Sequence, residues 1–163
     1  MIFLTVGTQF PFDRLVQAVD NIFEEALLGE EIFAQIGASL YKPRNFECVS
    51  CLDKRLFERW VQKASAIISH AGMGTITMAL DNEKPILVMP RLRRYAEVVN
   101  DHQVAIARKF EEFGHVLAAY STEQLPQKIM QLTTFVPKKR QSQAQLVVQR
   151  ITKFLNELNV PGK

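Results

Sequence analysis

The chain has 163 residues, of which 47% are hydrophobic and 23% are charged, and its formal net charge is +3. These values are those of one ordinary globular domain that is large enough to bury a core. The small net charge does not support a nucleic-acid partner, and every apolar run is far shorter than a membrane span. The N-terminus has neither the basic region nor the cleavage site of a signal peptide, and we expect a buried strand there.

Short apolar runs alternate with helical patterns in the N-terminal half. In chain order, we expect a strand at 2–6, a helix at 12–28, a strand at 32–36, a loop at 38–45, a weak strand at 46–49 and a helix capped by Asp53. Continuous apolar runs such as residues 2–6 are typical of strands that are buried on both faces of a parallel sheet.

The same alternation continues in the C-terminal half. The expected elements are a strand at 66–69, a helix at 74–80, a strand at 86–89, a polar loop at 91–100, a helix at 101–113, a strand at 115–117, a helix that ends at Leu132, and a terminal helix at 138–159. The pattern predicts an α/β fold in a single domain spanning residues 1–163. Its expected architecture is a Rossmann-like, doubly wound parallel sheet with right-handed crossovers and helices on both faces.

A turn of mostly small residues follows the strand at 66–69. It contains Ser69, His70, Ala71, Gly72, Met73, Gly74 and Thr75. Small side chains leave room for a diphosphate, and free N–H groups at the start of the next helix attract an anion. His70 has two interpretations: a catalytic base or cation near the phosphates, or a ring that fixes the loop through hydrogen bonds. The turn lacks both the Walker lysine and the Gly-x-Gly-x-x-Gly fingerprint.

Two further segments carry candidate ligand contacts. Gly7 ends the first strand and lets the backbone approach a ligand, while Thr8 and Gln9 offer donors; a plain strand-to-helix turn is the alternative. In the polar segment 91–103, Glu97 could accept ribose hydroxyls and Gln103 could donate to a sugar or phosphate. The arginines of this segment could neutralise a diphosphate, a lipid headgroup or an acidic partner, or lie in a solvated loop.

Cys48 and Cys51 form a Cys-x-x-Cys spacing. This spacing can indicate a redox or metal pair, but no second cysteine pair completes a zinc site. The favoured interpretation is two reduced thiols at a strand and its end, which places the chain in a reducing compartment such as the cytosol.

Three motifs, in this order, resemble the glycosyltransferase family 28 C-terminal domain. They are Gly7-Thr8-Gln9, the turn from Ile68 to Gly72, and the segment from Pro90-Arg91 through Glu97 to Asn100-Asp101-His102-Gln103. The likeness covers most of residues 1–135. Within the family, the chain resembles short bacterial polysaccharide-biosynthesis subunits of the PssE type. It is more distantly similar to the soluble catalytic subunit of the eukaryotic dolichol-linked UDP-GlcNAc transferase and to the donor lobe of MurG.

The resemblance implies the C-terminal, donor half of a GT-B fold, which binds a UDP-sugar. Gly7, Thr8 and residues 70–75 would face the diphosphate, and Gln103 with His102 would contact the donor sugar or its phosphate. A membrane-associated partner subunit would supply the other lobe and present a lipid-linked sugar acceptor, at the inner face of the cytoplasmic membrane. Such enzymes need no metal or other cofactor, because helix dipoles and backbone donors stabilise the leaving nucleotide diphosphate.

One position departs from the family pattern. In MurG-like proteins, a Glu after the glycine turn holds the ribose hydroxyls, and Met78 stands at that position here. Glu97 could take over this task, or ribose could be held differently. The general base is also open: His70 and His102 are the candidates within the chain, and the partner is another source.

Three functional hypotheses follow. The first is the catalytic, donor-binding subunit of a two-component transferase in exopolysaccharide or capsule biosynthesis. The second is a non-catalytic subunit that stabilises or enhances a partner transferase, and the third is a small redox protein. The terminal helix has an apolar face formed by Leu146, Val147, Ile151, Phe154, Leu155 and Leu158. We expect this face to pack on the chain's own sheet, with part of it shared with a partner.

Overall fold

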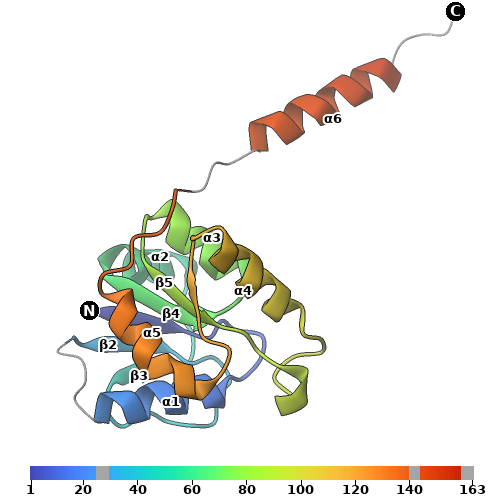
Figure 1. The fold of residues 1–163 in the computed structure, drawn as a ribbon. Helices are drawn as coiled ribbons and strands as arrows, with labels where there is room; N and C mark the ends of the chain where they lie inside the picture. The colour runs from blue at the N-terminus through green and yellow to red at the C-terminus, as the bar shows by residue number, and fades with distance from the viewer. Residues whose placement is uncertain (25–29, 140–143, 159–163) are drawn as a thin grey trace, which may run out of the picture.

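The computed structural model describes residues 1–24, 30–139 and 144–158. Its centre is a parallel six-stranded sheet in the order β3-β2-β1-β4-β5-β6 (Figure 1). The strands are β1 (Ile2–Thr5), β2 (Ile32–Gln35), β3 (Glu47–Val49), β4 (Ala66–His70), β5 (Ile86–Met89) and β6 (Leu117–Ala118). This is the doubly wound order, in which the direction of winding reverses between β1 and β4. The expected α/β fold is therefore confirmed.

Helices cover both faces of the sheet. They are α1 (Asp13–Glu24), α2 (Lys54–Lys63), α3 (Met73–Asp81), α4 (His102–Glu112) and α5 (Leu125–Leu132). The chain also forms α6 (Ala144–Leu158) and the 3-10 turns η1 (Arg93–Tyr95) and η2 (Thr122–Gln124). Asp53 caps α2 as predicted, since its carboxylate accepts a 2.9 Å hydrogen bond from the Leu56 N–H. The last strand begins two residues later than the 115–117 expectation.

Successive side chains of β1 point to opposite faces of the sheet, and a separate hydrophobic core lies on each face. Leu4 and its neighbours pack with α1 and α5, whereas Phe3 faces α2, α3 and α4. Phe3 is fully buried, and its ring contacts Phe57 edge-on at a centroid distance of 5.3 Å. Because both faces of each central strand are covered, the sequence needs uninterrupted apolar runs there.

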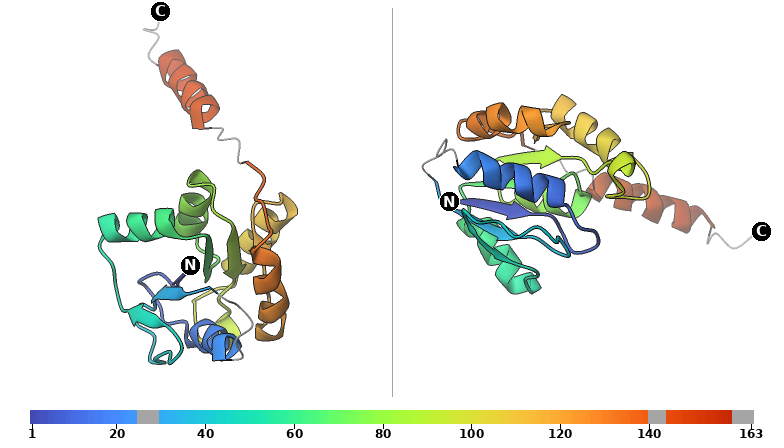
Figure 2. Two further views of the ribbon diagram at one scale, coloured as in Figure 1. Left: turned by 90° about the vertical axis from the view of Figure 1, so that its left-hand side faces the viewer. Right: turned by 90° about the horizontal axis from the view of Figure 1, so that it is seen from below.

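The terminal helix differs from expectation in two ways. α6 begins at Ala144, and the preceding residues 138–139 are not helical; residues 140–143 lie outside the described part. Its side chains Val147, Val148, Ile151, Phe154 and Leu155 are all exposed, and α6 stands apart from the sheet in every view (Figure 2). The expectation that this face packs on the sheet is wrong, because α1–α5 already complete both cores. The side chains of Leu146 and Leu158 lie outside the described part.

Among the described residues, no helix combines the length and apolar character needed to cross a membrane.

Candidate functional site

The carboxyl ends of β1 and β4 meet where the strand order reverses. Thr5 and Ser69 are paired in the parallel register, so the segments that follow them lie side by side. In open α/β sheets, ligands bind outside the strand ends at this switch point. Gly7 has a φ of +73°, which turns the chain away from β1, and Thr8 and Gln9 beyond it are exposed. The structure therefore brings the first two predicted motifs together.

The imidazole of His70 lies between two glycines of this switch point. A Cβ built on Gly7 would stand 3.0 Å from His70 Cε1, and a Cβ on Gly72 would overlap His70 Nε2. Neither position can carry a side chain without displacing the ring. The space that the His70 ring occupies thus explains why each of the two motifs has a glycine at this point.

The hydrogen bonds of His70 fix its tautomer. Ser69 Oγ donates to Thr5 O at 2.8 Å, and His70 Nδ1 lies 3.2 Å from the same Oγ. Because the hydroxyl proton is already used, we assign the proton to Nδ1, which leaves Nε2 unprotonated. The structure thus contains the contacts expected of a loop-fixing histidine.

Burial, helped by the charge of Arg91, lowers the pKa of His70 from 6.5 to about 4. His70 is therefore neutral at pH 7 in this structure. An imidazole with this pKa is a weak base at neutral pH. The role of His70 in catalysis stays a prediction.

The first turn of α3 is open to solvent. Gly72 is its N-cap and provides no side-chain cap, and its carbonyl accepts the first helical bond from Ile76 at 3.1 Å. The N–H groups of Met73, Gly74 and Thr75 therefore have no acceptor within the helix. Met73 and Gly74 are exposed, and a Cβ on Gly74 would meet no atom within 4 Å. This end of α3 offers several donors and a positive dipole end to an anion.

The segment after β5 forms a second wall of the switch point. Gln103 lies in the first turn of α4, and its Oε1 accepts a 3.1 Å hydrogen bond from the Arg91 N–H. The Arg91 Nη2 in turn donates to Val6 O and Phe10 O, each at 2.6 Å. Gln103 and Arg91 therefore connect the loop after β5 to the loop after β1.

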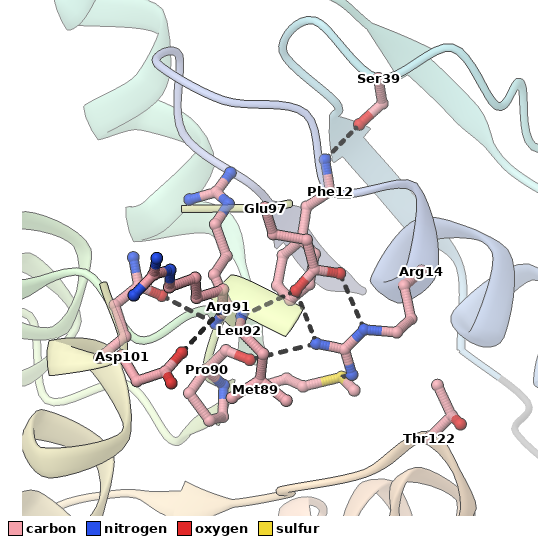
Figure 3. A network of polar contacts seen from close by, with 12 residues as sticks. Phe12, Arg14, Ser39, Met89, Pro90, Arg91, Leu92, Glu97, Asp101 and Thr122 are labelled. Carbon is pink, nitrogen blue, oxygen red and sulfur yellow. Dashed lines mark hydrogen bonds and ion pairs between the residues drawn. The ribbon is translucent and has the colours of Figure 1, made fainter. Parts of the chain in front are cut away.

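Glu97 connects the loop after β5 to α1. Figure 3 shows its carboxylate in a bidentate ion pair with Arg14 of α1, with both N–O distances at 2.8 Å. Glu97 Oε2 also accepts from the Leu92 N–H at 2.9 Å, and only 7% of the residue is exposed. These contacts hold the Glu97 loop against α1, and a part for Glu97 in ribose binding stays a prediction. No sequence pattern indicates this pairing, because Arg14 lies 83 residues away.

His102 is exposed at the start of α4, and its Nδ1 lies 2.6 Å from Asn100 Oδ1. In the part of the chain that the structure describes, its hydrogen bonds are with Asn100. The structure does not bring His102 into contact with His70, so its catalytic role also stays a prediction.

A groove of about 480 Å³ adjoins the start of α3 and separates it from α2. Met73, Gly74 and Met78 are among its lining residues. Met78 is half-buried and packs against the core on this side of the sheet. Its thioether has no charge to offer a ribose hydroxyl.

The two cysteines lie on either side of the end of β3. Cys48 is half-buried in the strand and packs against the core, whereas Cys51 is exposed in the following loop. Both thiols are free.

Comparison with known proteins identifies the family of this chain. Residues 1–158 match the glycosyltransferase family 28 C-terminal domain. The chain is 32% identical over 124 residues to the human UDP-N-acetylglucosamine transferase subunit ALG13, covering 71% of this chain and 10% of the relative. It is 37% identical over 92 residues to the ALG13 subunit of Cryptococcus neoformans, covering 55% of this chain and 42% of that relative. It thus spans less than half the length of these curated relatives.

Two solved structures share the fold. The solution structure of ALG13 superposes with a TM-score of 0.60 and 19% identity, covering 92% of this chain and 93% of that chain. The crystal structure of MurG from Acinetobacter baumannii gives 0.65 and 20%, covering 93% and 49%. The architecture is therefore that of the C-terminal half of a GT-B fold. This chain belongs to the glycosyltransferase family 28 C-terminal domain family.

Proposed function

We propose that this chain is the donor-binding, catalytic subunit of a two-component glycosyltransferase. It moves a sugar from a UDP-sugar to a lipid-linked acceptor, and we assign it to bacterial exopolysaccharide or capsule biosynthesis. The observation that carries the proposal is the open end of α3 beside the loop after β1, at the switch point. Its similarity to subunits named as UDP-N-acetylglucosamine transferases supports a UDP-sugar as the donor.

In this proposal the donor diphosphate lies at the N-terminus of α3. The N–H groups of Met73, Gly74 and Thr75 bind its oxygens, and the loop at Gly7 and Thr8 lies across them. As the bond from the sugar to the diphosphate breaks, negative charge grows on the leaving UDP. Fixed N–H donors and the helix dipole stabilise that charge without a metal ion.

A second subunit completes the active site, because transfer requires donor and acceptor to be held together and shielded from water. The carboxyl edge of the sheet supports a partner there. Exposed apolar side chains gather in the segments that follow the strands: Phe10, Leu40, Leu56, Met73, Tyr95 and Val99. Such a rim around a site is typical of a protein-protein contact. The partner also recruits the chain from the cytoplasm to the inner face of the membrane and supplies the lipid-linked acceptor.

One part of this rim is held rigidly. The loop between β2 and β3 carries Leu40, which is 86% exposed at its tip. Asp13 accepts the Tyr41 N–H at 2.9 Å, and Asp20 accepts the N–H groups of Arg44 and Asn45. A loop that is fixed before binding loses little entropy on docking, so we assign Leu40 to the partner contact.

Titration calorimetry tests the proposal. UDP, UDP-N-acetylglucosamine and UDP-glucose are titrated into the chain alone and into its complex with a co-expressed partner, such as the product of a neighbouring reading frame. We expect UDP binding and transfer activity in the complex, with GDP as the control for the base. Absence of UDP binding in both preparations rules the proposal out.

The alternative is a non-catalytic subunit that enhances a partner transferase. Met78 favours it, because a weakly accepting thioether stands where MurG-like proteins have a ribose-binding Glu. The Glu97 carboxylate, which is buried in an ion pair with Arg14, also favours it. Replacing His70 and Gln103 by Ala in the assembled complex separates the two functions. Loss of transfer supports the catalytic subunit, whereas full activity supports the alternative.

A further inference from the structure

Arg91 is a buried cation that no carboxylate neutralises. Only 3% of the residue is exposed, and its guanidinium donates hydrogen bonds to two main-chain carbonyls, those of Val6 and Phe10. Its Nε is buried and has no partner among the described residues. Arginines are almost never fully buried unless they are paired with an acid. This exception therefore calls for an explanation.

The nearest acid does not cancel the charge. Glu97 is close enough to raise the pKa of Arg91, but its oxygens are bonded to Arg14 and the Leu92 N–H. Arg14 and Arg91 both stand over the ring of Phe12, at 5.3 and 5.0 Å from its centroid. Around the Phe12 ring, two guanidinium groups thus share one buried carboxylate, and that carboxylate bonds to Arg14. Burial lowers the pKa of Arg91 to about 10, so it remains charged at neutral pH.

The guanidinium also fixes the loop that would meet a ligand. A single nitrogen, Nη2, bridges Val6 O and Phe10 O, which flank residues 7–9, of which Thr8 and Gln9 are exposed. The bridge closes the loop on itself, next to the switch point. A buried positive charge acts strongly there, because the surrounding protein screens it less than water does.

We propose that Arg91 is the fixed cation of the donor site and a positioning residue for the diphosphate. It holds the loop at residues 7–9 in place and supplies an unneutralised positive charge behind it. The inference rests on the proposed function, since the diphosphate of a UDP-sugar is the anion that this charge attracts. Burial, together with the same charge, lowers the pKa of the neighbouring His70.

The test separates charge from structure by comparing UDP with uridine, which has the same base and ribose but no phosphate. Affinities are measured by calorimetry for the wild-type chain in complex with its partner and for Arg91→Met, Arg91→Lys and Arg108→Met. Arg108→Met is the matched control, because this exposed arginine of α4 loses the same charge at the surface. Thermal unfolding shows which variants are folded.

We expect Arg91→Met to weaken UDP binding on the order of tenfold or more and to leave uridine binding unchanged. Arg91→Lys keeps the charge but cannot bridge two carbonyls in the same way, so we expect a smaller loss of UDP affinity. If Arg91→Met does not fold, Arg91→Lys replaces it as the test variant. Arg108→Met should bind UDP like the wild type. In NMR titrations, the pKa of His70 should rise in Arg91→Met, because a nearby positive charge is removed, and should change less in Arg91→Lys, which keeps that charge.

Two results overturn the inference while the proposed function stands. In the first, wild-type and both Arg91 variants bind UDP equally; in the second, the variants lose UDP and uridine in the same proportion, as expected of a structural clamp. If the wild-type complex binds neither UDP nor inorganic pyrophosphate, the proposed function and this inference fail together.

Discussion

At the residue scale, His70 illustrates how position changes the chemistry of a side chain. A histidine at a strand end, next to glycines, suggests a base or a phosphate-binding cation. The fold instead surrounds the ring with Gly7 and Gly72, gives Nδ1 a hydroxyl acceptor and places Arg91 nearby. The sequence could identify the position, but not the burial that determines its charge.

The pKa of His70 predicts a dependence of stability on pH. Its folded value of about 4 lies below the unfolded value of 6.5, so between these values the unfolded chain binds a proton that the folded chain does not. The free energy of unfolding should be unaffected by His70 above pH 6.5. It should fall by up to about 3 kcal/mol as the pH drops to 4. Urea unfolding measures the fall, and NMR of the His70 ring gives its pKa. A ring that titrates near 6.5 contradicts the assigned burial.

Gly72 and Gly74 form a matched pair for the space around His70. A methyl group at Gly72 overlaps the imidazole, whereas one at Gly74 enters open space. We expect Gly72→Ala to lower the free energy of unfolding by about 1–3 kcal/mol, as overpacking usually does. Gly74→Ala should be neutral or slightly stabilising, since Ala favours the helix. Equal urea midpoints for the two variants would show that the ring moves freely.

At the element scale, an ion pair joins a helix and a loop that lie far apart in the sequence. Alternating patterns predicted the strands and helices, and their order along the chain suggested a doubly wound sheet. They could not predict that α1 and the loop after β5 are joined by Arg14 and Glu97, because such pairings depend on the completed fold.

Removing Arg14 should leave a buried, unpaired carboxylate. The side chains of Arg14 and Glu97 are 17% and 9% exposed, so water compensates only in part. We expect Arg14→Met to cost about 3 kcal/mol of unfolding free energy, and Arg14→Met/Glu97→Met to recover much of that loss. Urea unfolding of the single and double variants measures both effects. A single variant as stable as the wild type would mean that the pair does not hold the loop.

Helix α6 is the element whose packing was predicted wrongly from the sequence. An amphipathic pattern is the same whether the apolar face packs on its own domain or on another protein, so periodicity alone could not decide. The described side chains from Val147 to Leu155 leave this face open, which agrees with the proposed partner contact.

Replacing Ile151 and Phe154 by Asp tests that contact. We expect these substitutions to weaken complex formation by about thirtyfold or more, the size typical of lost interface anchors, while the fold is retained. Met130→Asp is the control, because Met130 is 61% exposed on α5, away from α6. Binding is measured by pull-down and calorimetry with the co-expressed partner. An unaffected complex would exclude α6 from the interface.

At the scale of the whole molecule, the strand order 3-2-1-4-5-6 explains why distant motifs form one site. Gly7 and the turn at 69–75 are far apart in the sequence, yet they follow adjacent strands of the sheet. The motifs therefore predicted correctly that these two segments lie side by side, and their binding of a donor stays a prediction. The rest of the candidate site was less predictable, because a polar loop gave no sign that Arg91 is buried or that Glu97 is already paired.

The position of bound UDP tests the central claim most directly. UDP is titrated into the isotope-labelled chain, and the backbone amide resonances are followed by NMR. We predict that the largest shifts occur at Gly7, Thr8 and residues 72–75, the loop after β1 and the first turn of α3. Saturable binding that shifts amides elsewhere and leaves these positions unchanged would contradict the assignment of the switch point as the donor site.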